Sequence, residues 1–280
     1  MLKTTANHLF RRLEQLNGIG AALSRERDIE RLLENILEAA KALTGADGGT
    51  LYRVTDDQAA LRFEIMRTDS LGIRQGGTTG QRIHLPELPL RRADGTPNDA
   101  LVAAYAAIHD RTVNIADAYA EEGFDFSGTR AFDQRTGYRS QSFLTVPMKN
   151  HDGELIGVLQ LLNALDPDTG EVVPFSEADQ SLTESLASQA AIALSNRLLI
   201  TQLERLFESF VKLINVAIDE KSPYTGGHCE RVPELTMMLA EAADAANTGP
   251  QADFSMTERD RYELQMAGLL HDCGKITTPV

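Results

Sequence analysis

The sequence predicts an α+β domain with an antiparallel sheet and flanking helices, then a long connecting helix of coiled-coil type and a partial all-α domain. Pairs of apolar segments separated by turn residues indicate the sheet, and an apolar repeat with alternating steps of three and four residues indicates the connecting helix. The 280 residues suggest two domains, at about 150 residues each. We expect an N-terminal helix over 1–27, the α+β domain over 28–199, the connecting helix over 189–215 and the all-α part over 207–280.

The composition argues against several classes of protein. Proteins that bind nucleic acids present a basic surface that neutralises phosphates. This chain has a net charge of −14, so we expect no nucleic acid polymer as a partner. No apolar run reaches the roughly 18 residues of a membrane span, and no secretory signal is visible, so the predicted localisation is cytoplasmic, without a membrane. Cys229 and Cys273 are expected to be reduced there.

The α+β domain opens with an amphipathic helix over residues 28–43, with Asp28 as N-cap and Gly45 just past its end. Strands are expected over residues 49–54, 61–66, 143–149 and 154–163. Gly153 can take the positive φ that a tight hairpin between the last two requires. Between the strand pairs we expect a helix over 98–108, an apolar stretch at 112–115 and a Gly- and Arg-rich loop over 123–138. The helices are expected to group on one side of the sheet.

The connecting helix is predicted to begin with a capping box formed by Ser176 and Asp179. Its three-four repeat comprises Gln189, Ile192, Asn196, Leu199, Leu203, Leu206, Phe210 and Leu213. This spacing is typical of a coiled-coil seam, in which a buried Asn196 amide would favour a parallel dimer. We therefore expect a homodimer through residues 189–215. Before Arg197, a helix packed on its own sheet explains the pattern equally well.

The all-α part contains the candidate metal ligands. His271 and Asp272 are adjacent at the end of a predicted helix with a buried stripe of Tyr262, Met266 and Leu269. Taken singly, such a pair is more often a solvated helix end than a metal site. His228 is in helical register with Val232, Leu235 and Leu239, which predicts an imidazole pointing into the core. Pro233 indicates a kink, or a helix that starts at that residue.

Two strings in this part, YTGGHCERV and LLHDCGK, resemble the HD phosphohydrolase superfamily, and in particular its HD-GYP branch. The resemblance implies that His228, His271 and Asp272 are metal ligands, and that Asp272 and Lys275 are catalytic residues, with Lys275 meeting substrate phosphate. It also implies two divalent ions, Mn or Fe, and hydrolysis of cyclic di-GMP. Tyr224 stands where some relatives carry a carboxylate that binds a third metal. Without the resemblance, His228 would be interpreted as a core histidine and Lys275 as a solvated helix end.

The later histidines and the GYP loop of that branch would lie beyond Val280, so we expect this chain to be truncated and inactive by itself. A partial helical domain exposes apolar surface, so it is expected to be disordered, swapped or paired with a second chain. Two alternatives stay open: an HD phosphohydrolase for another nucleotide phosphoester, and a ligand-gated dimerisation module with no enzyme activity.

The order of elements over residues 28–199 resembles a GAF domain, and the segment LLNALDPDTGEVVPFSEADQ is similar to a signature of cyclic-nucleotide GAF domains through Asn163, Phe175 and Asp179. Ala164 and Gln180 replace the lysine and glutamate of that signature, so its internal ion pair cannot form. If a pocket exists, we expect it between the sheet and residues 78–138. The candidate ligand-binding residues there are His84, Arg130, Arg135 and Tyr138. The sequence does not identify the effector.

Overall fold

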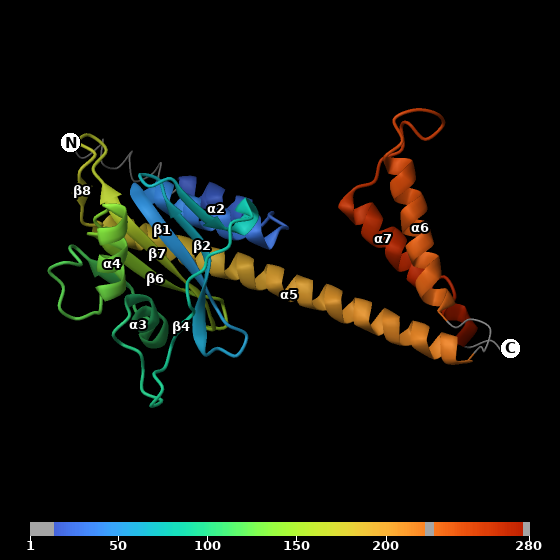
Figure 1. The fold of residues 1–280 in the computed structure, drawn as a ribbon, viewed down its shortest axis with the longest axis horizontal. Coiled ribbons are helices and arrows are strands. Elements are labelled where there is room, and N and C mark those ends of the chain that lie inside the picture. Colours follow the sequence, from blue (N-terminus) through green and yellow to red (C-terminus); the bar gives the residue numbers. More distant parts are fainter. Residues whose placement is uncertain (1–13, 222–226, 277–280) are drawn as a thin grey trace. The chain divides into compact units, whose positions relative to one another are not determined.

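The computed structural model describes residues 14–221 and 227–276 (Figure 1). The chain forms two compact units, one ending at Leu198 and the other beginning at Leu199. One helix, α5 (Glu177–Lys221), contributes residues to both units. None of the helices among the described residues combines the length and the apolar character that a membrane crossing needs.

The first unit is built on an antiparallel sheet with strand order β3-β2-β1-β7-β6-β5, in which β4 also pairs with β2 and β8 with β7. The strands are β1 (Ala46–Val54), β2 (Ala60–Thr68), β3 (Ile73–Gly76), β4 (Leu88–Pro89), β5 (Val113–Ile115), β6 (Phe143–Lys149), β7 (Leu155–Leu165) and β8 (Val172–Val173). The chain-adjacent pairs β1–β2 and β6–β7 confirm the predicted hairpins, while β3, β4 and β8 were not predicted.

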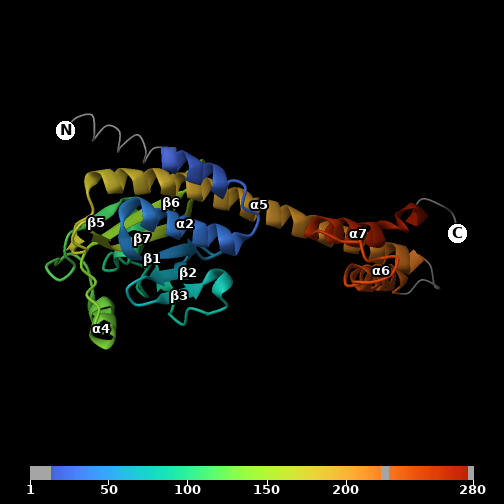
Figure 2. The ribbon, with the colours of Figure 1, turned by 90° about the horizontal axis from the view of Figure 1, so that it is seen from above.

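Helices cover both faces of this sheet. Residues 14–23, α2 (Ile29–Thr44) and the first part of α5 bury their apolar side chains against one face, together with Leu51 and Leu159 (Figure 2). The opposite face carries α3 (Val102–His109), which packs against Tyr52 and Val158. Successive strand residues point to opposite faces, so Leu51 and Tyr52 contact different layers. The expectation that the helices group on one side was therefore wrong.

The local signals at the element ends are confirmed. The Asp28 carboxylate accepts from the Arg31 backbone N–H at 2.9 Å, and Gly45 ends α2 in the left-handed conformation with φ 68°. Gly153 has φ 80° in the β6–β7 hairpin. The Ser176 hydroxyl accepts from the Asp179 N–H at 3.1 Å, while the Asp179 carboxylate accepts from the Ser176 N–H at 3.0 Å.

The segment predicted as a Gly- and Arg-rich loop contains a helix, α4 (Ser127–Thr136). The Asp125 carboxylate accepts from the Ser127 N–H at 2.8 Å near its start, and Gly137 ends it with φ 72°. Its buried side chain is that of Asp133, which accepts from the Ser140 N–H and hydroxyl, each at 2.8 Å. A helix held by polar bonds shows no apolar stripe, which is why periodicity did not predict it. The helix α3 likewise begins at Val102, later than predicted.

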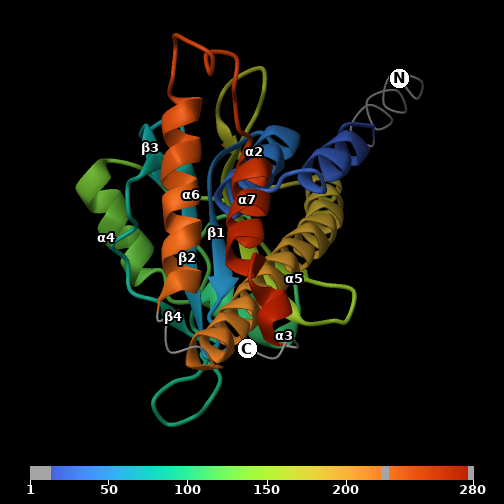
Figure 3. The same ribbon diagram turned by 90° about the vertical axis from the view of Figure 1, so that its right-hand side faces the viewer.

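The second unit contains the end of α5, the helices α6 (His228–Asp244) and α7 (Glu258–Leu270), and the short helix η2 (Cys273–Ile276). Figure 3 shows α6 and α7 side by side, and they are antiparallel, because Arg261 near the start of α7 pairs with Asp244 at the end of α6 at 2.6 Å. Thr257 forms the predicted capping box of α7. Pro233 lies inside α6, so of the two alternatives at this proline, the one in which the helix starts there was wrong.

Candidate metal centre

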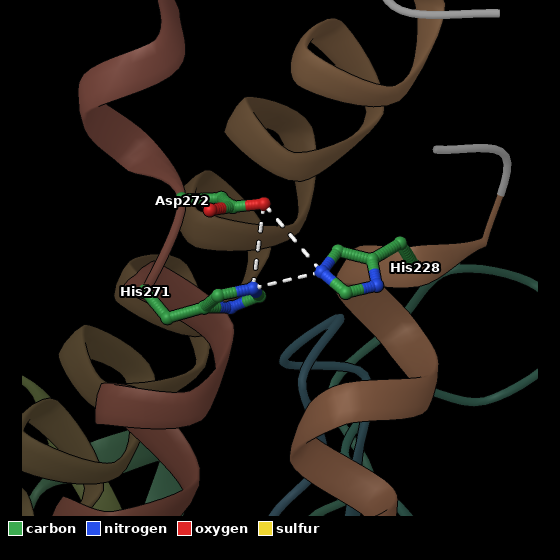
Figure 4. A group of neighbouring side chains, drawn as sticks. All are labelled: His228, His271 and Asp272. Atoms are coloured by element: carbon green, nitrogen blue, oxygen red, sulfur yellow. Dashed lines mark hydrogen bonds and ion pairs between the residues drawn. The ribbon is translucent and has the colours of Figure 1, made fainter. Parts of the chain in front are cut away.

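Three side chains that can ligate a metal ion converge at one end of the α6–α7 pair (Figure 4). The Nε2 atoms of His228 and His271 lie 3.2 Å apart. One carboxylate oxygen of Asp272, Oδ2, lies 3.6 Å from His228 Nε2 and 3.4 Å from His271 Nε2. Among the described residues, no other group of three such side chains comes this close together.

Packing of the two helices brings these ligands together. His228 is the first residue of α6, and His271 and Asp272 directly follow α7, whose Met266 and Leu269 are buried. The helices approach each other closely at Gly268, where an added Cβ would lie 3.0 Å from Pro233 Cα. The predicted buried stripe of α7 is confirmed, and Gly268 is a positioning residue that the sequence did not identify.

The imidazole of His271 is held in a form that suits metal binding. Its Nδ1 atom lies 2.7 Å from the Gly268 carbonyl oxygen. Because a carbonyl only accepts, Nδ1 carries the proton and the lone pair of Nε2 faces His228 and Asp272. Metal-ligating histidines usually donate their other N–H to such a group, which fixes the orientation of the ring.

The spacing of the three ligand atoms fits a small divalent cation. Metal–nitrogen bonds of about 2.0–2.1 Å in tetrahedral geometry place neighbouring ligand atoms about 3.3–3.4 Å apart. The three observed separations are 3.2, 3.4 and 3.6 Å. The side chain of Asp272 is 12% exposed, whereas those of His271 and His228 are 29% and 39% exposed, so the cluster is open to solvent on the histidine side.

His228 does not point into a core, which corrects the prediction from its register. Leu235 and Leu239, on the same predicted stripe, are 57% and 73% exposed. The buried side chains of α6 are instead Cys229 and Pro233, so the buried face is rotated by one residue. The imidazole faces His271 and Asp272 because this rotation turns it toward the end of α7.

Lys275 lies in η2, three residues after Asp272, and its side chain falls outside the described part of the chain. Its contact with substrate phosphate therefore stays a prediction.

The candidate ligand-binding residues of the first unit do not form one cluster. His84 is exposed in an irregular segment. The exposed guanidinium groups of Arg130 and Arg135 lie over the rings of Tyr119 and Phe132, 5.5 and 5.8 Å from the ring centroids.

Tyr138 is half-buried, and its hydroxyl donates to Asp47, a buried carboxylate that also accepts from Ser70. Burial and the Asp47 carboxylate raise the pKa of the Tyr138 phenol above its usual value. The hydrogen bond to Asp47 therefore holds Tyr138 between α4 and the start of β1. A ligand-binding role for Tyr138 stays a prediction.

Comparisons with protein families agree with this architecture. A family model of the GAF domain matches residues 28–194, more than half of the chain. The chain belongs to the GAF domain family. A second model, of the HD domain, matches residues 225–280, which include the three ligands of the candidate metal centre.

This chain is similar to two curated phosphodiesterases. It is 34% identical over 118 residues to dual 3′,5′-cyclic-AMP and -GMP phosphodiesterase 11A of Takifugu rubripes, covering 42% of this chain and 12% of that protein. It is 29% identical over 174 residues to dual 3′,5′-cyclic-AMP and -GMP phosphodiesterase 11 of Drosophila melanogaster, covering 61% of this chain and 11% of that protein. The chain therefore spans about a tenth of the length of these relatives.

A solved GAF domain from a phosphoenolpyruvate-protein phosphotransferase of Coxiella burnetii shares the fold. The TM-score is 0.51 at 17% identity, and the match covers 69% of this chain and 98% of that one.

The signature residues of the GAF domain have structural roles. The side-chain Oδ1 atom of Asn163 accepts from the backbone N–H of Gln141 at 2.7 Å and of Ser142 at 3.2 Å, and Phe175 is buried in the main core. Asp179 caps α5, while Gln180 bonds to Glu184 at 3.0 Å. These contacts stabilise the fold.

Proposed function

We propose that this chain is the sensor and part of the catalytic domain of a metal-dependent phosphodiesterase, in which the GAF domain regulates HD-type hydrolysis of cyclic di-GMP. The observation that carries the proposal is the convergence of His228, His271 and Asp272 on one point. The match to the HD domain and the phosphodiesterase names of the relatives support hydrolysis of a phosphoester. The strings YTGGHCERV and LLHDCGK favour the cyclic dinucleotide.

The chemistry assigns a separate task to each side chain. His228 and His271 would offer imidazole nitrogens and Asp272 a carboxylate to the first of two divalent ions, Mn or Fe. When bound, such an ion lowers the pKa of a water and neutralises charge on the phosphate. The Gly268 carbonyl keeps the His271 ring in position, as its 2.7 Å contact indicates. Lys275 is proposed to meet substrate phosphate.

The metal assignment can be tested by titrating the full chain with Mn²⁺ in a calorimeter. We expect Asp272→Asn to weaken binding at least about tenfold, because it removes the charged ligand. His151→Ala is the matched control: His151 also precedes an aspartate, at 3.2 Å, but no third ligand among the described residues joins this pair. Equal affinity of the wild type and Asp272→Asn would refute the centre.

Turnover by a manganese-loaded protein that carries this chain together with a complete HD domain separates the candidate activities. Conversion of cyclic di-GMP to linear pGpG supports the proposal. Hydrolysis of a different nucleotide phosphoester, with cyclic di-GMP untouched, would instead support the alternative HD phosphohydrolase. Metal binding without any turnover would favour a ligand-gated dimerisation module.

A homodimer through α5 is the second part of the proposal. On one face of α5, Val211 and Ile218 are buried within the second unit. A second apolar face, about 110° away at 3.6 residues per turn, is exposed and comprises Leu199, Leu203, Leu206, Phe210 and Leu213. A helix with two apolar faces needs two partners, and the three-four spacing of the exposed face fits a second copy.

The exposed part of the predicted seam begins after its first residue, Gln189, whose side chain fills the space beside Gly20. We expect Leu206→Glu to convert the dimer to a monomer in sedimentation velocity runs. Lys212→Glu, which changes charge on an exposed position away from this face, is the control. A wild-type monomer at micromolar concentration would contradict the dimer.

A further inference from the structure

Asn215 is a buried polar side chain in the second unit. It is 4% exposed, and neither its Oδ1 nor its Nδ2 atom has a hydrogen-bond partner among the described residues. A carboxamide offers two donors and one acceptor, and buried polar groups in folded proteins are nearly always paired. An unpaired amide at this position therefore calls for a functional explanation.

The packing of α5 on α7 defines the level at which Asn215 lies. Burial raises the pKa of the Tyr262 phenol, and the carboxylate of Glu208 raises it further, which places this turn of α5 near Tyr262. Val211 lies in one buried cluster with Met266 and Leu269 of α7. Figures 1 and 3 show that the two helices run in the same direction. One more turn, about 3.6 residues, brings Asn215 to the level of residues 271–273.

The metal centre lies at this level. Asp272 is 12% exposed and turns its Oδ2 atom toward both histidines. Ligating carboxylates are themselves held by hydrogen bonds, just as the Gly268 carbonyl holds His271. A neutral amide can donate such a bond without repelling a cation, whereas a lysine or arginine would add positive charge.

We propose that Asn215 is a positioning residue of this centre, whose side-chain N–H donates to the Asp272 carboxylate and holds it toward the two histidines when a divalent cation is bound. This role rests on the proposed function of the cluster. Asn215 does not touch the ion. The hydrogen bond restricts the movement of Asp272, the one charged ligand. It also gives a partner to the Asn215 amide, which has no other partner among the described residues.

The test is Asn215→Leu in the full chain, with Mn²⁺ as the probe. Leucine has nearly the same volume and no polar atoms. We expect Mn²⁺ affinity to fall roughly 10- to 100-fold, the usual effect of removing such a supporting bond. We also expect the thermal midpoint of the metal-free protein to stay the same or rise, because an unpaired buried amide is removed. A purely structural residue would not separate these two measurements.

The matched control is Val211→Ala, one turn earlier on the same buried face. It should lower the thermal midpoint and leave Mn²⁺ affinity of the folded protein unchanged. Wild-type Mn²⁺ affinity in Asn215→Leu would overturn the role of Asn215 alone. A variant that lost both thermal midpoint and Mn²⁺ affinity would overturn it too, because general damage to the packing explains that result. If the folded wild type bound no Mn²⁺, the metal centre itself would be refuted, and this role with it.

Discussion

Replacing Gly268 by alanine would place a methyl group between α6 and α7. The new Cβ would lie 3.0 Å from Pro233 Cα and 3.2 Å from Pro233 Cβ. Carbon atoms in contact normally sit about 3.5–4.0 Å apart. The two helices would have to separate by roughly half an ångström at this point. Because His228 lies on one helix and His271 follows the other, the separation would also spread the metal ligands.

Two effects of this substitution oppose each other. Overpacking of a tight contact costs about 1–3 kcal/mol, whereas alanine stabilises a helix interior by about 1 kcal/mol over glycine. We expect a net loss of about 0–2 kcal/mol in the free energy of unfolding of the second unit. The matched control is Gly18→Ala, in the helix over residues 14–23, where an added Cβ meets nothing within 4 Å. That variant should gain up to about 1 kcal/mol.

Urea unfolding, monitored by hydrogen exchange of the amides in α6 and α7, measures the stability of this unit. Mn²⁺ titration of the folded variant measures the ligand geometry. We expect weaker Mn²⁺ binding in Gly268→Ala and wild-type binding in Gly18→Ala. Two results together would refute the close approach at Pro233 as the cause of the ligand geometry. They are a gain of stability in Gly268→Ala equal to that of Gly18→Ala, and Mn²⁺ binding like that of the wild type.

Three further outcomes are expected. Arg67→Met should destabilise the GAF domain by about 3 kcal/mol in urea unfolding, because it breaks the buried ion pair with Glu34 at 2.8 Å, whereas Arg62→Met, at an exposed pair, should cost less than about 1 kcal/mol. The pKa of Tyr138 is raised in the folded state. The contribution of Tyr138 to stability is therefore fully present below the usual phenol pKa of about 10 and is lost as the pH rises above that value. Compared with the wild type, Tyr138→Phe should lose less stability between pH 9 and 12, roughly the range of that titration. Thr257→Ala should cost the second unit about 1 kcal/mol, and an unchanged urea midpoint would argue against the capping box as a stabilising contact.

The sequence predicted the features that depend on residues close together in the chain. The Asp28 cap, the left-handed Gly45 and the Ser176 capping box each join residues a few positions apart, so their signal is local. The helix α4 was missed because Asp133 holds it through bonds to Ser140 rather than through an apolar stripe.

The candidate metal centre shows the limit of a dipeptide signal. His-Asp pairs also occur at His109 and His151, each followed directly by an aspartate. Of the described residues, the structure gives a third ligand to the pair at His271 alone. The resemblance of the surrounding strings selected this pair from the sequence, whereas the pattern of histidine and aspartate could not.

By itself, the sequence determined the α+β architecture and the long helix α5. These follow from hydrogen bonds and periodicities over a few residues. Only the tertiary structure decided that α3 covers the second face of the sheet, that His228 faces His271 across 43 residues, and that Asn215 is buried without a described partner. Each depends on how helices pack, as at Gly268 and Pro233, and packing between distant segments leaves no local pattern in the sequence.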